Sequence, residues 1–176
     1  MLLPAIKIKK ILFATDLSES SRYAFGYAQS IANLYGAGIT ILHVLMESPN
    51  LDSKMTIWVG EDRWEQIKQR NIESARQTLI GKKRDNPAIR EALLKFCEIA
   101  QDACEGVTFV PDEILVERGN PADQILQQAV DHECDLIVIG SHGHGSLQDV
   151  VMGGTANRVL RRSKVPVLMV PLPPQP

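Results

Sequence analysis

The sequence predicts an α/β protein in which helices cover both faces of a parallel β-sheet. Short apolar runs rich in β-branched residues alternate along the chain with segments of helical periodicity. The runs lack the strict alternation of apolar and polar residues that is typical of a strand with one solvent-exposed face, so they suit strands that are covered on both faces. Right-handed crossovers are expected to join such strands.

The N-terminal half is expected to contain two strands with a helix between them. The first strand is residues 10–15 (KILFAT), and Ser18 precedes a helix with several apolar positions on one side, which are Ala24, Ala28, Ile31, Ala32 and Tyr35. Gly36 and Gly38 end that helix. Residues 39–45 (ITILHVL) form the next apolar run, which predicts the second strand.

The middle of the chain has a different pattern. From residue 46 to residue 106 no strand is evident, and two helical segments are expected, from residue 61 to about 81 and from residue 87 to about 104. We interpret this region as a long crossover with one helix more than a βαβ unit needs. A separate small domain is the alternative, although a few helices alone could barely bury a core.

The C-terminal half is expected to supply three more strands, at residues 113–118 (EILVER), 135–140 (DLIVIG) and 165–170 (VPVLMV). Asn120 and Pro121 provide an N-cap and a first-turn proline for the helix between the first two. Its apolar positions are Ala122, Ile125, Leu126, Ala129 and Val130. A short helix from near Thr155 to Arg162 precedes the last strand.

Composition limits the class of protein. The 176 residues, 44% of them hydrophobic, suit a single domain at residues 1–171 with a proline-rich tail at 172–176. A net charge of -2 argues against nucleic acid as a partner. The longest apolar runs are strand-sized, well short of the ~18 residues of a membrane span, and the N-terminus shows no signal-peptide cleavage site. We therefore expect a cytoplasmic protein with no membrane contact.

The three cysteines do not predict a disulfide framework or a zinc site. Cys97, Cys104 and Cys134 are odd in number and form no CxxC motif. Cys97 shares a helical stripe with Ile89, Leu93 and Phe96, which favours a core position. His142 and His144 lie two residues apart without a third ligand nearby in sequence, so we expect no dedicated metal site.

A glycine-containing loop follows the strand at 135–140. In an open parallel sheet, ligands bind beyond the carboxyl ends of the strands. We expect the glycines to let a ligand approach the main chain and to let the loop adopt positive φ, while the helix beginning near Thr155 offers N–H groups to an anion. This pattern favours phosphate binding, and a tight turn with a flexible surface loop is the alternative.

Two common phosphate motifs are absent from the sequence. There is no G-x-x-x-x-G-K-[ST], and no G-x-G-x-x-G follows the first strand. The spacing Gly140-x2-Gly143-x9-Gly153 instead resembles the ATP-binding signature G-x2-G-x9-G-[ST] of the universal stress protein family. The resemblance extends to Asp16 after the first strand and to ILHV in the second, and it covers residues 8–44 and 112–171.

The resemblance implies a five-stranded parallel sheet of order 3-2-1-4-5, with the extra helix in the crossover between the second and third strands. It also implies a cleft for ATP, ADP or AMP, with Mg²⁺ held only through the phosphates. The nucleotide-binding residues that it implies are Ala14, Thr15, Asp16, Val44, Ile139, Gly140, His142, Gly143, Gly153, Gly154, Thr155 and Ala156. Of these, the residues up to Val44 would lie along adenine and ribose, and Gly153 to Thr155 would cradle the phosphates.

This chain departs from the signature at its end. Gly154 stands where the family has a hydroxyl residue directly after the third glycine, and Ala156 replaces a second hydroxyl. One side-chain hydrogen bond contributes about 0.5–1.5 kcal/mol, so we expect its loss to lower the affinity for the nucleotide several-fold and not to abolish binding.

The function implied is that of an adenine-nucleotide-binding stress-response regulator or nucleotide sensor that acts through protein partners. A nucleotide-free dimeric interaction module is one alternative. A very slow ATPase is the other, because the loop has no Lys or Arg before Arg158 to stabilise a transferring phosphoryl group. We expect no catalytic residues, and the resemblance implies a homodimer formed through the strand at 165–170.

Overall fold

The computed structural model describes residues 5–45, 60–62, 66, 87–102, 111–143 and 153–172. Five parallel strands form one sheet in the order β3-β2-β1-β4-β5, which confirms the predicted fold class and strand order. The strands are β1 (Lys10–Thr15), β2 (Gly38–Leu45), β3 (Glu113–Arg118), β4 (Leu136–Gly140) and β5 (Val167–Val170).

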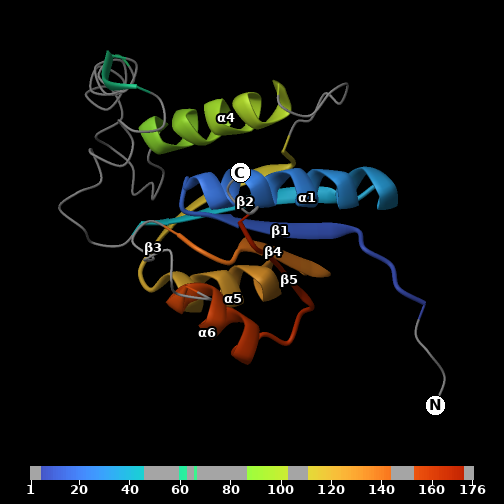
Figure 1. Cartoon of the computed structure of the whole chain (residues 1–176). Coiled ribbons are helices and arrows are strands. Elements are labelled where there is room, and N and C mark those ends of the chain that lie inside the picture. Colours follow the sequence, from blue (N-terminus) through green and yellow to red (C-terminus); the bar gives the residue numbers. More distant parts are fainter. Residues whose placement is uncertain are drawn as a thin grey trace, which may run out of the picture.

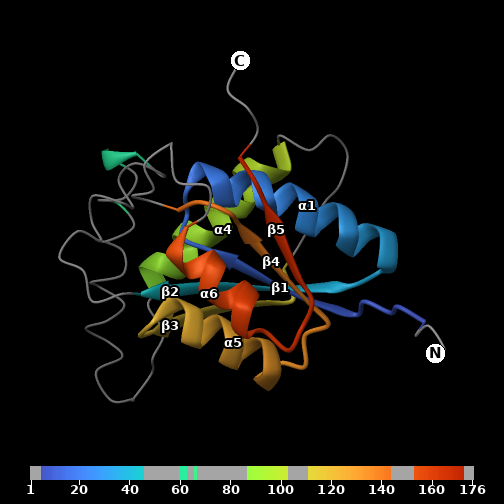
Figure 2. The same ribbon diagram turned by 60° about the horizontal axis from the view of Figure 1, so that its bottom comes forward.

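Helices cover both faces of this sheet. The described helices are α1 (Glu19–Tyr35), α4 (Pro87–Asp102), α5 (Pro121–Asp131) and α6 (Gly154–Arg162). Helices α1 and α4 lie on one face, and α5 and α6 lie on the other (Figure 1). Helices α5 and α6 run side by side (Figure 2). An ion pair of 2.6 Å between Asp123 and Arg162 joins them.

Local sequence signals explain the helix boundaries. The Ser18 side chain accepts a hydrogen bond from the Ser21 amide at the start of α1, and Gly36 ends that helix with φ 63. The Asn120 side chain caps α5 by accepting from the amides of Ala122 and Asp123. These caps lie where the sequence predicted them.

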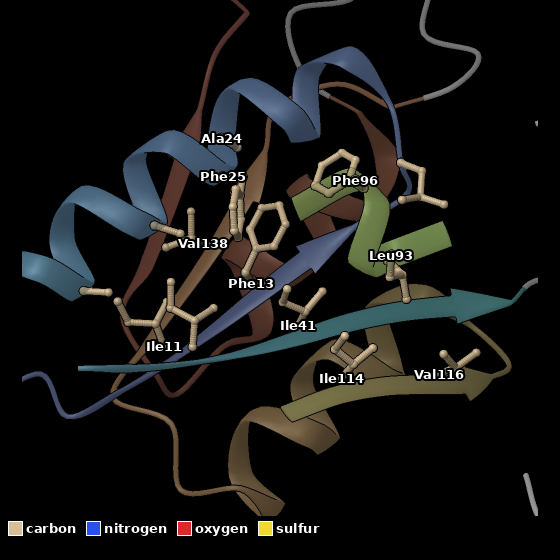
Figure 3. Packing of buried hydrophobic residues seen from close by; sticks show 14 of the residues in the cluster. Ile11, Phe13, Ala24, Phe25, Ile41, Leu93, Phe96, Ile114, Val116 and Val138 are labelled. Carbon is tan, nitrogen blue, oxygen red and sulfur yellow. The ribbon is translucent and has the colours of Figure 1, made fainter. Parts of the chain in front are cut away.

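The layer between the sheet and α1 and α4 is built around three phenylalanines. The rings of Phe13 on β1, Phe25 on α1 and Phe96 on α4 lie 5.1 to 6.3 Å apart. Figure 3 shows them together above the strands. Ile89 and Leu93 of α4 are also buried, which confirms these positions of the predicted apolar stripe, while the side chain of Cys97 lies outside the described part of the chain. This layer fixes α1 against β1 and against β4, whose carboxyl end leads into the glycine loop.

A second layer fills the space between the sheet and α5 and α6. It includes Leu12 and Ile137 from the strands, Ile125 from α5 and Val159 from α6, all buried. Cys134 lies in the same cluster, and burial raises the pKa of its thiol from 9.0 to about 11, which suits an unreactive core residue.

Some details differ from the sequence-based expectation. Val130 of α5 and Tyr35 at the end of α1 are exposed although they share the apolar period of their helices. Strand β5 begins at Val167 and not at residue 165, because Pro166 has no N–H and only its carbonyl takes part, accepting from the Ile137 amide. The helix expected from residue 61 to about 81 lies almost entirely outside the described residues.

Helix α4 lies in the crossover between β2 and β3 and corresponds to the second of the two helices expected there. It packs against α1 and β3 and so covers the part of the sheet that α1 leaves open. Among the helices that the structure describes, none combines the length and the apolar character needed to cross a lipid bilayer.

Candidate functional site

The carboxyl ends of β1, β2 and β4 meet at one edge of the sheet, where the expected nucleotide-binding residues lie. In the sheet β1 is flanked by β2 and β4, with Ala14 level with Ile139 and Thr15 level with His43. Asp16 and Val44 follow directly after the latter pair. Strands one, two and four thus bring residues far apart in sequence to one edge, as open parallel sheets do at their ligand sites.

An apolar floor lies on the α5 and α6 face of this edge. Ala14, Ile139 and Ala156 are buried in the same cluster, and Val44 packs against it while remaining partly exposed. Ala156 belongs to the first turn of α6, so the floor runs directly to the start of that helix. Its chemistry suits the flat, weakly polar surface of a base.

The first turn of α6 presents uncapped main-chain donors beside the floor. Gly153 is the N-cap residue, and no described side chain caps the helix, whereas Ser18 caps α1 and Asn120 caps α5. A Cβ built on Gly154 meets no described atom within 4 Å. Free N–H groups and the positive end of the helix dipole together attract an anion.

The glycine loop is tied to this turn by its main chain. The Gly153 amide donates to the Ser141 carbonyl at 2.7 Å, and a Cβ at position 153 would lie 3.1 Å from the same oxygen. Position 153 therefore favours glycine, because a Cβ there would press on the backbone of residues 141–143.

Gly143 and Asp16 lie in contact. A side chain at position 143 would collide with the Oδ2 atom of Asp16, whose Oδ1 accepts a 2.9 Å hydrogen bond from the Ser18 amide. The carboxylate is thus held between the start of α1 and the glycine loop, at the rim of the apolar floor. A carboxylate in this place can accept hydrogen bonds from sugar hydroxyls.

Gly140 lies directly against helix α1. A Cβ there would lie 2.8 Å from Ser20 Oγ and 3.3 Å from the Ser20 backbone, on the α1 face of the sheet. The glycine therefore permits the close approach of α1. The expectation of positive φ is wrong for Gly140, Gly143, Gly153 and Gly154, since the positive-φ glycines that the structure describes are Gly36, Gly60 and Gly119.

Two further expected residues have side chains engaged within the protein. The Thr15 hydroxyl lies 2.9 Å from Ser21 Oγ and accepts from the Leu17 amide, on the α1 face of the sheet. His142 is half-buried, and its Nδ1 lies 2.7 Å from Ser141 Oγ. His144 lies outside the described residues.

Comparison with known proteins decides the family. The model of the universal stress protein family matches residues 7–171. The chain belongs to the universal stress protein family. Universal stress protein MJ0577 of Methanocaldococcus jannaschii is 28% identical over 175 residues, which cover 94% of this chain and 96% of that protein. Universal stress protein MJ0531 of the same organism is 31% identical over 168 residues, with coverages of 94% and 83%.

Solved structures of the family share the fold. The structure of MJ0577 has a TM-score of 0.63 at 24% identity and covers 97% of this chain and 100% of its own. A universal stress protein solved in complex with cAMP has a TM-score of 0.57 at 22% identity, with coverages of 94% and 98%. These likenesses agree with the strand order described above.

Sequence reasoning missed several residues that shape the candidate site of this universal stress protein. His43, Ser20, Ser21 and Ser141 are buried polar residues around the strand ends, and Leu17 has a φ of 66. His43 gave a weak signal, as a titratable residue within an otherwise apolar strand. The others gave none, because serines near a helix start are ordinary and the conformation of Leu17 is set by its neighbours.

Proposed function

We propose that this universal stress protein binds an adenine nucleotide at the carboxyl edge of β1, β2 and β4, and acts as a stress-response regulator or nucleotide sensor through protein partners in the cytoplasm. The uncapped first turn of α6 is the observation that carries the proposal, because it lies next to an apolar floor and a fixed carboxylate. Membership of the family and the relative solved with cAMP support it.

The residues present fit the parts of such a ligand. Ala14, Val44 and Ile139 offer an apolar surface to the base. Asp16, next to that surface, offers acceptor oxygens to ribose hydroxyls. The amides at the start of α6 suit phosphate oxygens, and the open space at Gly154 leaves room for them. Mg²⁺, where present, would come with the phosphates of ATP or ADP.

A substitution at position 154 provides the sharpest test, because it is expected to change nucleotide binding without lowering the stability of the fold. The Cβ of a Gly154→Asp side chain meets no described atom within 4 Å, and a carboxylate in a first helical turn stabilises the helix by about 0.3–1 kcal/mol. The same carboxylate repels phosphate. We expect this variant to fold as well as the wild type and to lose at least about tenfold in ATP affinity.

Gly154→Ser is the matched control. It restores the hydroxyl that the family signature places there, and we expect it to bind ATP up to several-fold more tightly than the wild type, at about 0.5–1.5 kcal/mol per added hydrogen bond. Calorimetric titration of nucleotide-stripped protein with ATP, ADP and AMP, with and without Mg²⁺, measures both variants. Equal affinity of wild type and Gly154→Asp for ATP would contradict phosphate binding at this turn.

The loop glycines supply a second measurement. A valine at position 143 collides with Asp16, and one at position 153 presses on the Ser141 carbonyl. We expect either substitution to abolish nucleotide binding. If the wild type shows no heat with any of the three nucleotides, the glycines only shape a loop, and the nucleotide-free interaction module becomes the better description.

A homodimer formed through the C-terminal strand completes the proposal. Strand β5 lies at an edge of the sheet, and its residues Val167, Leu168 and Met169 are only half-buried within the chain. An apolar edge strand of this kind invites pairing with a second copy.

A further inference from the structure

The turn between β1 and α1 contains a disfavoured backbone conformation. Leu17 has a φ of 66, in the left-handed region that branched residues avoid, yet its side chain is only 1% exposed and packs in the cluster of Phe13 and Phe25. A residue persists in this conformation only where its surroundings fix it. Asp16 immediately precedes Leu17, so whatever fixes the turn also orients that carboxylate.

A buried chain of hydroxyl groups holds the turn. The Leu17 amide donates to Thr15 Oγ1 at 2.9 Å, Thr15 Oγ1 lies 2.9 Å from Ser21 Oγ, and Ser21 Oγ donates to the Ser18 carbonyl at 2.9 Å. Each hydroxyl has one hydrogen, and that of Ser21 goes to Ser18, so Thr15 must be the donor to Ser21. The bonds run in one direction, and each polarises the next.

His43 holds the same residue from the neighbouring strand. Its Nδ1 atom lies 2.8 Å from the Thr15 carbonyl oxygen, and because a carbonyl only accepts, Nδ1 carries the hydrogen. His43 is 6% exposed and lies on the same face of β2 as Ile41 and Leu45, whose side chains pack beneath α1 and α4. The last peptide group of β1 is thus bonded to a buried side chain of β2.

We propose that His43 and Thr15 are positioning residues that fix the Asp16 turn before a nucleotide arrives. Their side chains lie on the α1 face, opposite Ala14 and Ile139, so they act through Asp16 and not by touching the ligand. Binding then orders fewer groups, which raises affinity. The inference rests on the proposed nucleotide site, and it assigns a role to residues that lie outside the glycine signature.

A pair of substitutions at His43 separates hydrogen bonding from packing. His43→Leu fills the space but has no donor, whereas His43→Asn places an amide nitrogen where Nδ1 was. We expect His43→Leu to weaken ATP binding by about tenfold and His43→Asn to stay within about threefold of wild type, as the loss of one buried hydrogen bond predicts. Equal losses in the two variants, or no loss in His43→Leu, would overturn the proposal.

A double-mutant cycle tests whether the effect passes through Asp16. In an Asp16→Ala background the turn has no carboxylate left to position, so adding His43→Leu should cost less than about threefold in affinity. A full tenfold cost in that background would mean that His43 acts elsewhere. Thr15→Val against Thr15→Ser repeats the comparison at the hydroxyl chain and serves as the second pair if His43→Leu does not fold.

A ligand-free measurement keeps this inference distinct from the nucleotide proposal. Amide hydrogen exchange at Leu17 reports its bond to Thr15 directly, and exchange at Val138 in β4 reports the global stability of the sheet. We expect His43→Leu and Thr15→Val to speed exchange at Leu17 relative to Val138, and the Asn and Ser variants to preserve it. If the ratio of the exchange rates at Leu17 and Val138 does not change in these variants, the positioning role is wrong. If the ratio changes but titration of the wild type with ATP gives no heat, only the nucleotide site is wrong.

Discussion

At the scale of single residues, the glycines of the signature have different neighbours and therefore different purposes. A Cβ at position 140 would meet Ser20 of α1, one at 143 the carboxylate of Asp16, and one at 153 the loop backbone, whereas one at 154 would meet none of the described atoms within 4 Å. A sequence motif treats these positions alike. Their contacts show that one of them serves the fold, two keep the loop close to its neighbours, and one leaves room at the helix start.

This difference predicts unequal costs for the same substitution. Gly140→Ala places a methyl group 2.8 Å from Ser20 Oγ and 3.3 Å from its backbone, so we expect it to lower the free energy of unfolding by about 1–3 kcal/mol. Gly154→Ala is the control and should change it by less than about 0.5 kcal/mol. Urea unfolding measures both. A Gly140→Ala protein as stable as the control would mean that α1 can shift at little cost.

At the scale of elements, the direction of the main-chain groups in β5 decides what its outer edge offers. The Ile137 amide bonds to the Pro166 carbonyl and the Ser141 amide to that of Val170, so residues 166, 168 and 170 face β4. The alternate residues Val167 and Met169 therefore direct their N–H and C=O groups to the open edge of the sheet.

The proposed homodimer is therefore testable at one edge position. Met169→Pro removes an outward N–H without touching the ladder to β4, and we expect it to give monomers at concentrations where the wild type is dimeric. Met169→Ala shortens the side chain but keeps the N–H, so it should remain dimeric. Light scattering at tens of micromolar measures all three proteins. A monomeric wild type, or a dimeric Met169→Pro protein, contradicts pairing through this edge.

At the scale of the whole molecule, the proposed ligand contacts elements from across the chain. The proposed site is formed by β1, β2, β4 and α6, so it exists only in the folded protein. A bound nucleotide would therefore raise the free energy of unfolding. At a ligand concentration 100 times Kd the gain is about 2.7 kcal/mol.

For a domain of this length that gain should raise Tm by roughly 5–11 °C with saturating ATP. The Gly154→Asp protein is the control and should show no such rise at the same ATP concentration. A thermal scan of both proteins with ATP, and with inorganic phosphate alone, measures the effect. An equal rise in wild type and variant would place the stabilising ligand somewhere other than the first turn of α6.

The periodicity of apolar residues and the residues that cap the helices were enough to predict the secondary-structure elements and the α/β class. Alternating apolar runs and helical stripes predicted five strands and the helices around them, and Ser18, Gly36 and Asn120 marked helix boundaries that the structure confirms. The glycine spacing predicted the family to which the chain belongs. These signals are local, since each depends on residues a few positions apart.

The tertiary structure decided what each residue of the site contacts. That Gly140 serves the packing of α1, that Thr15 directs its hydroxyl away from the apolar floor, and that His43 bonds to the end of β1 all depend on pairs of elements meeting in space. Strand register sets these contacts, and a shift of one residue would move every side chain to the other face. The sequence by itself determined the elements, their order along the chain and the family; only packing determined which groups at the strand ends contact α1 and which line the apolar floor.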